Sequence, residues 1–252
     1  MQQINGITWF DCNCSIGFSK LPEDQPVCNA SGLKEHMACC GISEALVWNI
    51  ACRNYDPMTG NQELNSMLAG SMSIHPMWTI IPGHAGDFCK PEDLPGEMKK
   101  HGVKAVRVFP SAECHNFSLK PWTMDKIYRV LEEYQIPLFI GLEQTSWEEV
   151  HEIAAGYGKL KIIVTGVGYR NGRMVYPLME ACRNVYIETS MFKVPCELDR
   201  LVGRFGPERF LFGTGYPKYS MGSAIALVSY CSMSNEEKGL IASGNLIELL
   251  GA

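Results

Sequence analysis

Short apolar segments recur along the chain, and a longer segment with helical spacing of apolar residues follows each of them. This alternation is typical of strand–helix–strand units that carry a parallel sheet. Two apolar segments, Leu138–Ile140 and Lys161–Val164, are continuous rather than alternating, as expected for strands covered on both faces. The pattern predicts eight strands, at Ile7–Cys14, Ala45–Ala51, Met77–Pro82, Ala105–Phe109, Pro137–Leu142, Lys161–Val167, Asn184–Thr189 and Phe210–Gly213.

The segments between these strands carry signals for the starts of helices. Ser146 and Ser234 each precede a Glu by three residues, at Glu149 and Glu237. This spacing matches the capping box, in which the two side chains satisfy each other's free backbone amides. Helices should therefore begin at both serines. A further helix over 197–205 should pack one apolar stripe on the barrel, formed by Leu198, Leu201, Val202 and Phe205.

The number of strand–helix repeats and the chain length together predict the fold class. Eight repeats within 252 residues are the size of one (β/α)8 TIM barrel. No linker or low-complexity tract interrupts the repeats. We therefore expect an α/β protein with a single barrel domain over residues 1–252.

The charge pattern excludes two classes of partner. The net charge of −5 is spread along the chain, with no basic stripe for a phosphate backbone and no Lys/Arg cluster for anionic lipid. No apolar run reaches the roughly 18 to 20 residues that cross a bilayer, and the first ten residues do not resemble a leader. We expect no nucleic acid or membrane partner and a cytoplasmic location, while a homo-oligomer is compatible with the sequence.

The chain has 11 cysteines, but they lack the dense, regular spacing of small disulfide-rich scaffolds. No Cys-x-x-Cys pair is present. Cys12 and Cys14 point to the same side of a strand, yet nothing near them in sequence completes a tetrahedral zinc site. Free thiols in a reducing compartment are the expectation.

The most specific motifs lie in the first, sixth and eighth predicted strands. Residues 207–217, P-E-R-F-L-F-G-T-G-Y-P, resemble the signature G-P-E-R-x-L-F-G-S-D-x-P of the amidohydrolase-related (amidohydrolase 2) family. Residues 11–17, D-C-N-C-S-I-G, are similar to its D-x-H-x-H-x-G, and residues 162–168, I-I-V-T-G-V-G, resemble its I-I-L-x-H-x-G. Further similarity lies in 33–47, 91–110, 184–190 and 244–251, so the resemblance covers most of the chain. It implies a TIM barrel related to hydrolases, lactonases and decarboxylases.

At the positions of the family's metal ligands, this sequence has other residues. Asn13 and Ser15 stand where the first strand should carry two histidines, Gly166 replaces a histidine and Gly215 replaces an aspartate. Gly141 stands at another histidine in a shorter match over 137–141. Metal-assisted hydrolysis needs nitrogen and carboxylate ligands at about 2 Å from the ion. The replacements therefore predict a barrel with no metal and no cofactor, in which positions 13, 166 and 215 still meet at the mouth.

The three glycines leave volume where the strand ends converge. An unfilled cavity costs on the order of 24 cal/mol per Å³. We therefore expect the space to be filled by neighbouring side chains such as Trp48, Phe109 or Tyr216, by ordered water, or by an organic ligand larger than the family's usual substrates.

TIM-barrel enzymes carry their sites at the carboxyl ends of the strands, and polar residues remain there. Arg107 is the candidate anchor for a substrate carboxylate, because a guanidinium offers paired donors. The alternative is a salt bridge with Glu143 or Glu188, of which Glu188 is expected to be chiefly structural. The other candidate substrate-binding residues are Asn13, Ser15, Thr165 and Tyr216.

Two residues are candidates for proton transfer. Glu143 follows the fifth strand and would serve as general base if an apolar wall raised its pKa; the alternative is a solvated side chain. His84 lies on the glycine-flanked loop 82–86 after the third strand, and it is the only histidine that the pattern places near the mouth.

Three hypotheses remain open for the function. The first is a metal-independent hydrolase or lyase acting on a small carboxylate, lactone or amide through Arg107, Glu143 and His84. The second is a catalytically inactive barrel that binds a metabolite or a partner protein, since fold does not determine function. The third, and least favoured, is a metal enzyme with relocated ligands at Glu143, Glu188 and His84. A cluster of Arg107, Glu143 and His84 around one cavity would favour the first.

Overall fold

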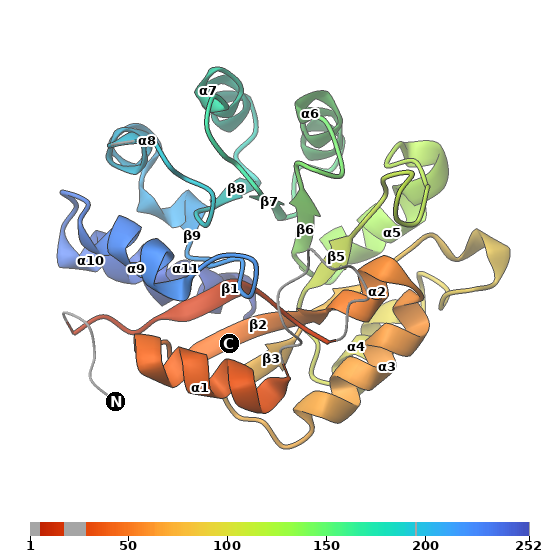
Figure 1. Cartoon of the computed structure of the whole chain (residues 1–252). Helices are drawn as coiled ribbons and strands as arrows, with labels where there is room; N and C mark the ends of the chain where they lie inside the picture. The colour runs from red at the N-terminus through yellow and green to blue at the C-terminus, as the bar shows by residue number, and fades with distance from the viewer. Residues whose placement is uncertain (1–5, 18–28, 195, 252) are drawn as a thin grey trace.

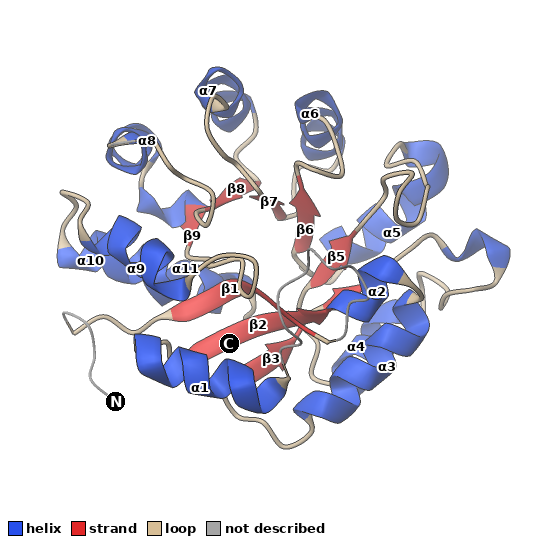
Figure 2. Ribbon diagram, viewed as in Figure 1, coloured by secondary structure: helices blue, strands red, loops and turns tan. Residues whose placement is uncertain are grey.

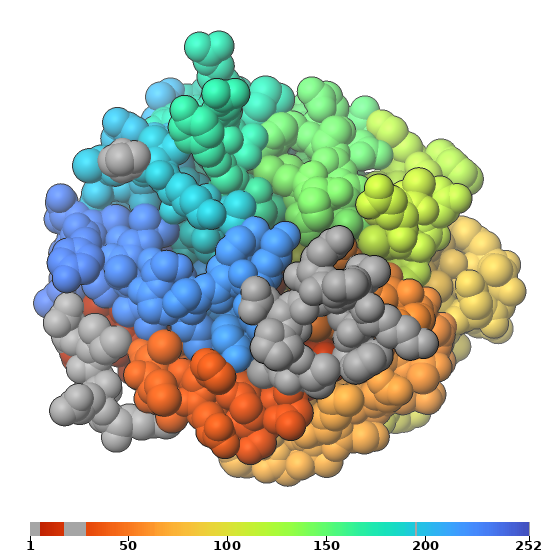
Figure 3. Space-filling model, in the orientation of Figure 1, coloured from red at the N-terminus to blue at the C-terminus, as the bar shows by residue number. Residues whose placement is uncertain are grey.

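The computed structural model describes residues 6–17, 29–194 and 196–251. They form a ring of parallel strands with helices outside it (Figure 1). In the space-filling view, successive segments follow one another around the molecule in chain order (Figure 3). The strands are β1 (Phe10–Ile16), β2 (Glu44–Asn49), β3 (Ile74–Pro76), β4 (Trp78–Thr79), β5 (Val106–Val108), β6 (Leu138–Gly141), β7 (Ile162–Thr165), β8 (Val185–Glu188) and β9 (Phe210–Leu211).

The third barrel strand consists of two short pieces, a correction to the single strand predicted over 77–82. The first piece, β3, pairs with β2, and the second, β4, pairs with β5. Pro76 ends the first piece because it has no N–H to extend the ladder. The N–H of Met77 then donates to Val47 O at 2.7 Å, and that of Trp78 donates to Ala105 O at 3.2 Å. At this break the hydrogen-bonding partner of the third barrel strand changes from β2 to β5.

The barrel closes between β1 and the segment that begins with β9. The N–H of Cys12 donates to Phe212 O at 3.0 Å, which joins the first and last strands. On its other side β1 pairs with β2 as far as Ile16. The first strand therefore runs two residues beyond its predicted end. The second ends two residues early, because the Asn49 side chain accepts from Ala51 N at 3.0 Å and starts a helix.

The helices lie outside the strand ring (Figure 2). The predicted helix starts at Ser146 and Ser234 are confirmed, since both capping boxes form. The predicted stripe of the helix over 197–205 is also packed inward, with Leu198, Leu201 and Val202 buried. The helices are α1 (Ala30–Cys40), α2 (Ile50–Asn54), α3 (Pro57–Leu68), η1 (Gly83–Ala85), α4 (Leu94–Lys100), α5 (Pro121–Glu133), α6 (Trp147–Gly156), α7 (Gly172–Ala181), α8 (Glu197–Phe205), η2 (Pro207–Arg209), α9 (Met221–Ser229), α10 (Asn235–Gly239), the π-helical turn η3 (Leu240–Gly244) and α11 (Asn245–Leu249).

The apolar core has two parts, because neighbouring strand residues point to opposite faces of the sheet. Phe139 and Ile163 belong to a smaller cluster, whereas Leu138 and Ile162 belong to the large one that also contains buried residues of the surrounding helices. Both faces of these strands are therefore apolar, which explains why their sequences are continuous rather than alternating.

Two further features concern the described part of the chain. None of its helices is both long enough and apolar enough to cross a membrane. The cysteines that it contains are free thiols, and several of them are buried.

Candidate active site at the barrel mouth

Four barrel strands carry polar side chains at or near their carboxyl ends, on the face where TIM-barrel enzymes have their sites. Asn13 belongs to β1, Arg107 to β5, Thr165 to β7 and Glu188 to β8, and all four are buried. Glu143 follows β6 on the next loop and is exposed. We call these five residues the mouth cluster.

Arg107 is held from several sides within the mouth cluster. Its Nη1 donates to Asn13 Oδ1 at 2.8 Å, and its Nη2 donates to Thr165 Oγ1 at 3.1 Å. The guanidinium carbon also lies 5.0 Å from the ring centroid of Trp48 and 5.2 Å from that of Phe109, a distance at which aromatic faces attract a cation. Only 4% of Arg107 is exposed. The guanidinium is therefore fixed inside the barrel and does not point into solvent.

The charge of Arg107 has no ion-pair partner in the described part of the chain. Burial lowers the pKa of Arg107, while the nearby carboxylates of Glu143 and Glu188 raise it. Neither carboxylate forms a salt bridge with it there, so the alternative suggested by the sequence is not found. Its Nε–H is buried and also without a partner among the described residues. A buried donor left unpaired costs about 1 to 3 kcal/mol, so an acceptor from a ligand would be favoured at this atom.

Glu188 orients Asn13, which in turn holds Arg107. Glu188 Oε2 accepts from Asn13 Nδ2 at 3.3 Å and from Ser190 Oγ at 2.8 Å, while Oε1 accepts from Ser190 N at 2.6 Å. Because the amide nitrogen of Asn13 faces Glu188, its amide oxygen is left to accept from Arg107. Burial raises the pKa of Glu188 to about 7, although the hydrogen bonds from Ser190 and the charge of Arg107 lower it.

The raised pKa of Glu188 predicts a pH-dependent stability. The folded protein favours the protonated carboxyl, so this contribution is fully present below pH 4.5 and is lost as the pH rises to about 7. Glu188→Gln should remove that slope, which amounts to about 3 kcal/mol of unfolding free energy. Urea unfolding of wild type and variant between pH 4.5 and 8 measures it. Glu35→Gln, at an exposed position of α1, is the control and should keep the slope; parallel curves for wild type and Glu188→Gln would contradict the assignment.

Asp11, the first residue of the first-strand motif, joins the two ends of the barrel. Its Oδ1 accepts from the backbone N–H groups of Asn13 and Thr214, each at 3.0 Å. Its Oδ2 accepts from Cys14 Sγ at 2.9 Å and from the Thr214 hydroxyl. Burial raises the pKa of Asp11, and these hydrogen bonds oppose the rise. Both carboxylate oxygens accept hydrogen bonds, and those from Thr214 join β1 to the segment after β9. Asp11 therefore helps to close the barrel, a role that does not depend on the replaced metal ligands at positions 13 and 15.

The glycines at the aligned ligand positions are covered by other side chains. A Cβ at Gly141 would lie 2.4 and 2.5 Å from the carboxylate oxygens of Glu143, and one at Gly166 would lie 3.1 Å from Glu143 Oε2. A Cβ at Gly215 would lie 2.8 Å from the ring of Tyr219. Glu143 thus occupies the space that two ligand side chains would need. Glycine at position 141 is what allows this carboxylate to reach the mouth.

This arrangement corrects the expectation about which side chains fill the space. Trp48 and Phe109 pack on the guanidinium of Arg107, whereas the side chains beside the glycines are Glu143 and Tyr219. The difference arises because Glu143 and Tyr219 belong to loops that turn back over the strand ends. Strand spacing alone does not reveal such a turn.

Ser15 and Tyr216, both predicted to bind substrate, lie together at the seam between the first and last strands. The N–H of Ser15 donates to Tyr216 O at 2.9 Å, and its hydroxyl lies 3.5 Å from the same oxygen. The ring of Tyr216 packs on His36 of α1, with 5.1 Å between the centroids. Their contact with a substrate remains a prediction.

The positions aligned with the family's ligands meet at one end of the barrel. The N–H of Gly215 donates to Asn13 O at 2.9 Å. Asn13 is joined through Arg107 to Thr165, the neighbour of Gly166. The motif alignment therefore predicted correctly which strand ends converge.

His84 does not join Arg107 and Glu143 through any contact in the described part of the chain. It is exposed on η1, and its Nε2 lies 3.1 Å from the carbonyl oxygen of Thr123 at the start of α5. His84 lies on the loop predicted from the sequence, but its ring contacts the start of α5. The expected cluster of Arg107, Glu143 and His84 is thus not found: the carboxylate of Glu143 raises the pKa of Arg107, whereas His84 bonds to the backbone of α5.

Two residues that the sequence patterns did not single out lie beside the mouth cluster. Arg53, on α2, has a buried Nε–H without a partner among the described residues. Burial has the largest effect in lowering the pKa of Arg107, and the charge of Arg53 adds a smaller effect in the same direction. His115, on the loop after β5, donates from Nε2 to Cys52 O at 2.7 Å, and burial lowers its pKa. The sequence signal that could have identified them is that Arg53 follows β2 and His115 follows β5.

The described residues do not fit the metal centre that the family motifs imply. No group of three or more His, Cys, Asp and Glu side chains among them is arranged to hold a metal ion, and this includes Glu143, Glu188 and His84. Asn13 Oδ1, an oxygen at an aligned ligand position, already accepts from Arg107. Because the guanidinium is itself a cation, this donor set favours an anion over a metal ion.

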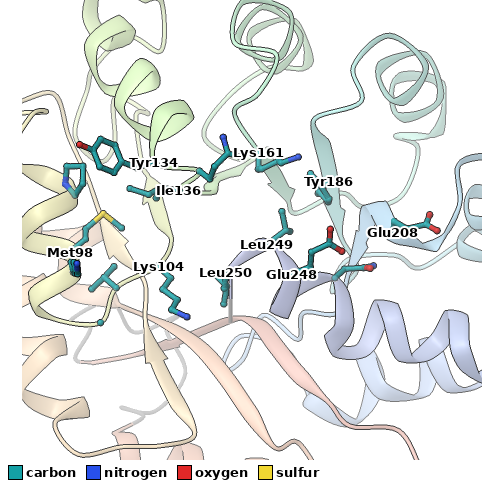
Figure 4. A pocket seen from close by; sticks show the side chains of 17 residues that line it. Met98, Lys104, Tyr134, Ile136, Lys161, Tyr186, Glu208, Glu248, Leu249 and Leu250 are labelled. Carbon is teal, nitrogen blue, oxygen red and sulfur yellow. The ribbon is translucent and has the colours of Figure 1, made fainter.

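A cavity of about 780 Å³ lies at the opposite end of the barrel. Its walls come from residues that precede or begin the later strands, and from α11 (Figure 4). Lys104, Lys161 and Glu248 line it together with Tyr186 and Leu250. None of the mouth cluster contributes to its lining, so cavity size and candidate chemistry do not coincide in this protein.

Comparisons with known proteins agree with this architecture. A family model described as amidohydrolase (amidohydrolase 2) matches residues 92–224, and no curated protein matches the sequence. The 2,6-dihydroxybenzoate decarboxylase from Rhizobium has a TM-score of 0.78 and 13% identity, over 97% of this chain and 99% of that one. A 5-carboxyvanillate decarboxylase from Novosphingobium aromaticivorans, solved with manganese and 4-hydroxy-3-methoxy-5-nitrobenzoic acid, has a TM-score of 0.75 and 14% identity, over 98% of this chain and 97% of that one. An uncharacterised TIM-barrel protein from Bordetella bronchiseptica has a TM-score of 0.74 and 14% identity, over 97% of this chain and 99% of that one.

The similarities to solved structures have low identity and show the fold alone, and they confirm the predicted (β/α)8 TIM barrel. The match to the family model extends over more than half of the 252 residues, from the segment before β5 to α9. It includes Arg107, Glu143 and Glu188 as well as the three glycines at the aligned ligand positions. The chain belongs to the amidohydrolase (amidohydrolase 2) family.

Proposed function

We propose that the protein is a metal-independent lyase that decarboxylates a small, carboxylate-bearing molecule at the barrel mouth. The observation that carries this proposal is Arg107, a buried guanidinium with a free Nε–H and no described ion-pair partner. An anion that reached Arg107 would find a fixed donor beside two aromatic rings. A planar, unsaturated acid suits these surroundings best.

The family and the similar structures support this class of reaction. Two of the structures with the same fold are named as decarboxylases of hydroxylated aromatic acids. Hydrolysis is less favoured for this chain, because the hydrolases of such barrels use a metal to activate water. The described residues at the mouth do not fit that ion. Decarboxylation instead requires a proton donor and a positioned substrate.

Glu143 is the residue that we propose for the proton transfer. Decarboxylation breaks the bond between carbon and the carboxyl group, releases CO2 and leaves the bonding electrons on the substrate carbon. Glu143 would give that carbon a proton and take one up from solvent, to which it is exposed. Its carboxylate lies over Gly141 and Gly166, at the end of the barrel where Arg107 is held.

A non-catalytic barrel that binds a metabolite or a partner protein is the second candidate. The position of His84 favours it, because this histidine bonds to the backbone of α5 and makes no described contact with Arg107 or Glu143. Under this alternative, Arg107 would still bind an anion, but no product would form.

The experiment that tests the proposal is the release of CO2 from 2-hydroxybenzoate and 2,6-dihydroxybenzoate by the purified protein. We expect one CO2 for each decarboxylated product, followed together by gas analysis and proton NMR. Binding of these acids without any product would reject the lyase and leave the binding barrel.

A further inference from the structure

The cavity at the amino-terminal end of the barrel is separate from the mouth cluster. Its volume of about 780 Å³ is in the range of sites that bind small molecules. A smaller hollow of about 240 Å³ shares Gly102, Lys104 and Leu250 with it, so the two spaces meet at Lys104. No residue of the mouth cluster lines either space. An inference about this cavity therefore does not rest on the proposed function.

The helix α11 forms a fixed wall of this cavity. Asn245, its first residue, donates from Nδ2 to Pro207 O at 2.8 Å and to Phe210 O at 2.9 Å. Leu246 and Leu250 are buried in the smaller core cluster, together with residues of several barrel strands. The cavity is the space between this helix and the segments that precede β5, β6 and β7 (Figure 4).

Much of the cavity wall is aliphatic. The aliphatic lining residues are Met98, Val103, Ile136, Leu249 and Leu250. Tyr134 also lines the cavity, and it is 57% exposed, so it lies at the rim. In Figure 4, Met98 and Tyr134 lie on one side of the cavity, and Glu208 and Glu248 lie on the opposite side. An aliphatic wall that includes a flexible methionine suits a flexible hydrocarbon chain.

Lysines without ion pairs lie between these two sides. Lys104 precedes β5 and Lys161 precedes β7, with β6 between them. Two strand spacings put their backbones about 10 Å apart, so both long side chains can reach one ligand group. Neither lysine forms an ion pair in the described part of the chain. Instead, Lys161 Nζ lies 5.9 Å from the ring centroid of Tyr186.

The charges that line the cavity favour a ligand with a single negative charge. Lys99, Lys104 and Lys161 face Glu208 and Glu248, which leaves an excess of one positive charge. In the smaller hollow, the carboxylate of Glu44 is already paired with His75 at 2.6 Å. A cation beside an apolar wall attracts an anion whose body is apolar.

We propose that this cavity binds a medium-chain aliphatic carboxylate. Its hydrocarbon chain lies along the wall of Met98, Ile136 and Leu249, and its carboxylate lies at Lys104 and Lys161. An aliphatic chain fits better than an aromatic ring, because Tyr134 is at the rim and the ring of Tyr186 already faces Lys161. The site thus differs from the mouth, where a fixed guanidinium lies beside two aromatic rings.

The test is isothermal titration calorimetry with decanoate, below the concentration at which it forms micelles, and with butyrate. We expect one decanoate per chain. Decanoate should bind at least about ten times more tightly than butyrate, because its longer chain removes more apolar surface from water. The double variant Lys104→Gln/Lys161→Gln should bind decanoate about tenfold more weakly, the combined effect of losing two partly exposed charge pairs.

Two controls locate the binding site. Lys34→Gln/Lys126→Gln removes the same two charges from exposed positions of α1 and α5, and its affinity for decanoate should stay within about twofold of wild type. Arg107→Met alters the mouth and should also leave decanoate binding unchanged, because Arg107 does not line the cavity. Circular dichroism and thermal unfolding establish that all three variants are folded.

Each outcome either supports or rejects the cavity site. If decanoate does not bind, or binds no more tightly than butyrate, the inference fails. An unchanged affinity in Lys104→Gln/Lys161→Gln rejects the role of the two lysines. Equal losses in both double variants, with several decanoates per chain, indicate nonspecific adsorption and also reject the site. If Arg107→Met alone loses binding, the acid occupies the mouth, so the cavity inference fails while the proposed carboxylate site stands.

Discussion

Replacing Arg107 by Met should weaken the binding of benzoate by about 2 to 5 kcal/mol, or about 30-fold to several thousand-fold. The unbranched Met side chain can still pack against Trp48 and Phe109. It provides no donor to the ligand, so the anion would lose its fixed partner in a buried site. Calorimetric titration of wild type and variant measures the difference.

The same substitution on the surface controls for the loss of a charge. Arg173→Met should bind benzoate with an affinity within threefold of wild type, because the residue is exposed on α7. Arg107→Lys offers a second comparison, since it keeps the charge and loses the planar fork of donors; an intermediate affinity is expected. Equal affinities of wild type and a folded Arg107→Met would reject Arg107 as the carboxylate anchor.

Glu143→Gln should lower the rate of CO2 release by about 100- to 10,000-fold, the usual contribution of a general acid or base. Glutamine has nearly the same shape and can occupy the same place over Gly141 and Gly166. It cannot deliver and regain a proton. Because the positive charge of Arg107 is unchanged, the affinity for an unreactive acid such as benzoate should stay within about threefold. The measurement is single-turnover product formation together with calorimetry.

Glu113 provides the matched control for this substitution. It is exposed on the loop after β5, and Glu113→Gln removes the same charge. Turnover within twofold of wild type is expected. A comparable loss in both variants would show that net charge, rather than proton transfer by Glu143, determines the rate.

The convergence of the strand ends could be predicted from the sequence because it follows from a regular architecture. Once the parallel strands are assigned, their carboxyl ends meet at one face. Asn13, Arg107 and Thr165 are therefore expected at the same face, and Arg107 forms hydrogen bonds to the other two. The helix starts at Ser146 and Ser234 could also be predicted from the sequence, because a capping box is a local interaction.

The loops limited what the sequence could predict about the mouth. The turn that brings Glu143 over Gly141 and Gly166 depends on the path of the backbone after β6. His84 lies on the predicted loop, but its ring direction is decided by the packing of η1 against α5. Side-chain direction in a loop depends on contacts with elements far away in the sequence, and spacing patterns do not contain them.

We propose that a guanidinium, and not a metal ion, supports the reaction at this mouth. The most direct test is CO2 release from 2,6-dihydroxybenzoate by chelator-treated protein, with the metal content of the same sample determined by elemental analysis. We expect turnover to continue unchanged when less than one metal ion per hundred chains remains, and added manganese to have no effect. Loss of turnover on chelation, with recovery in proportion to bound manganese, would contradict the account.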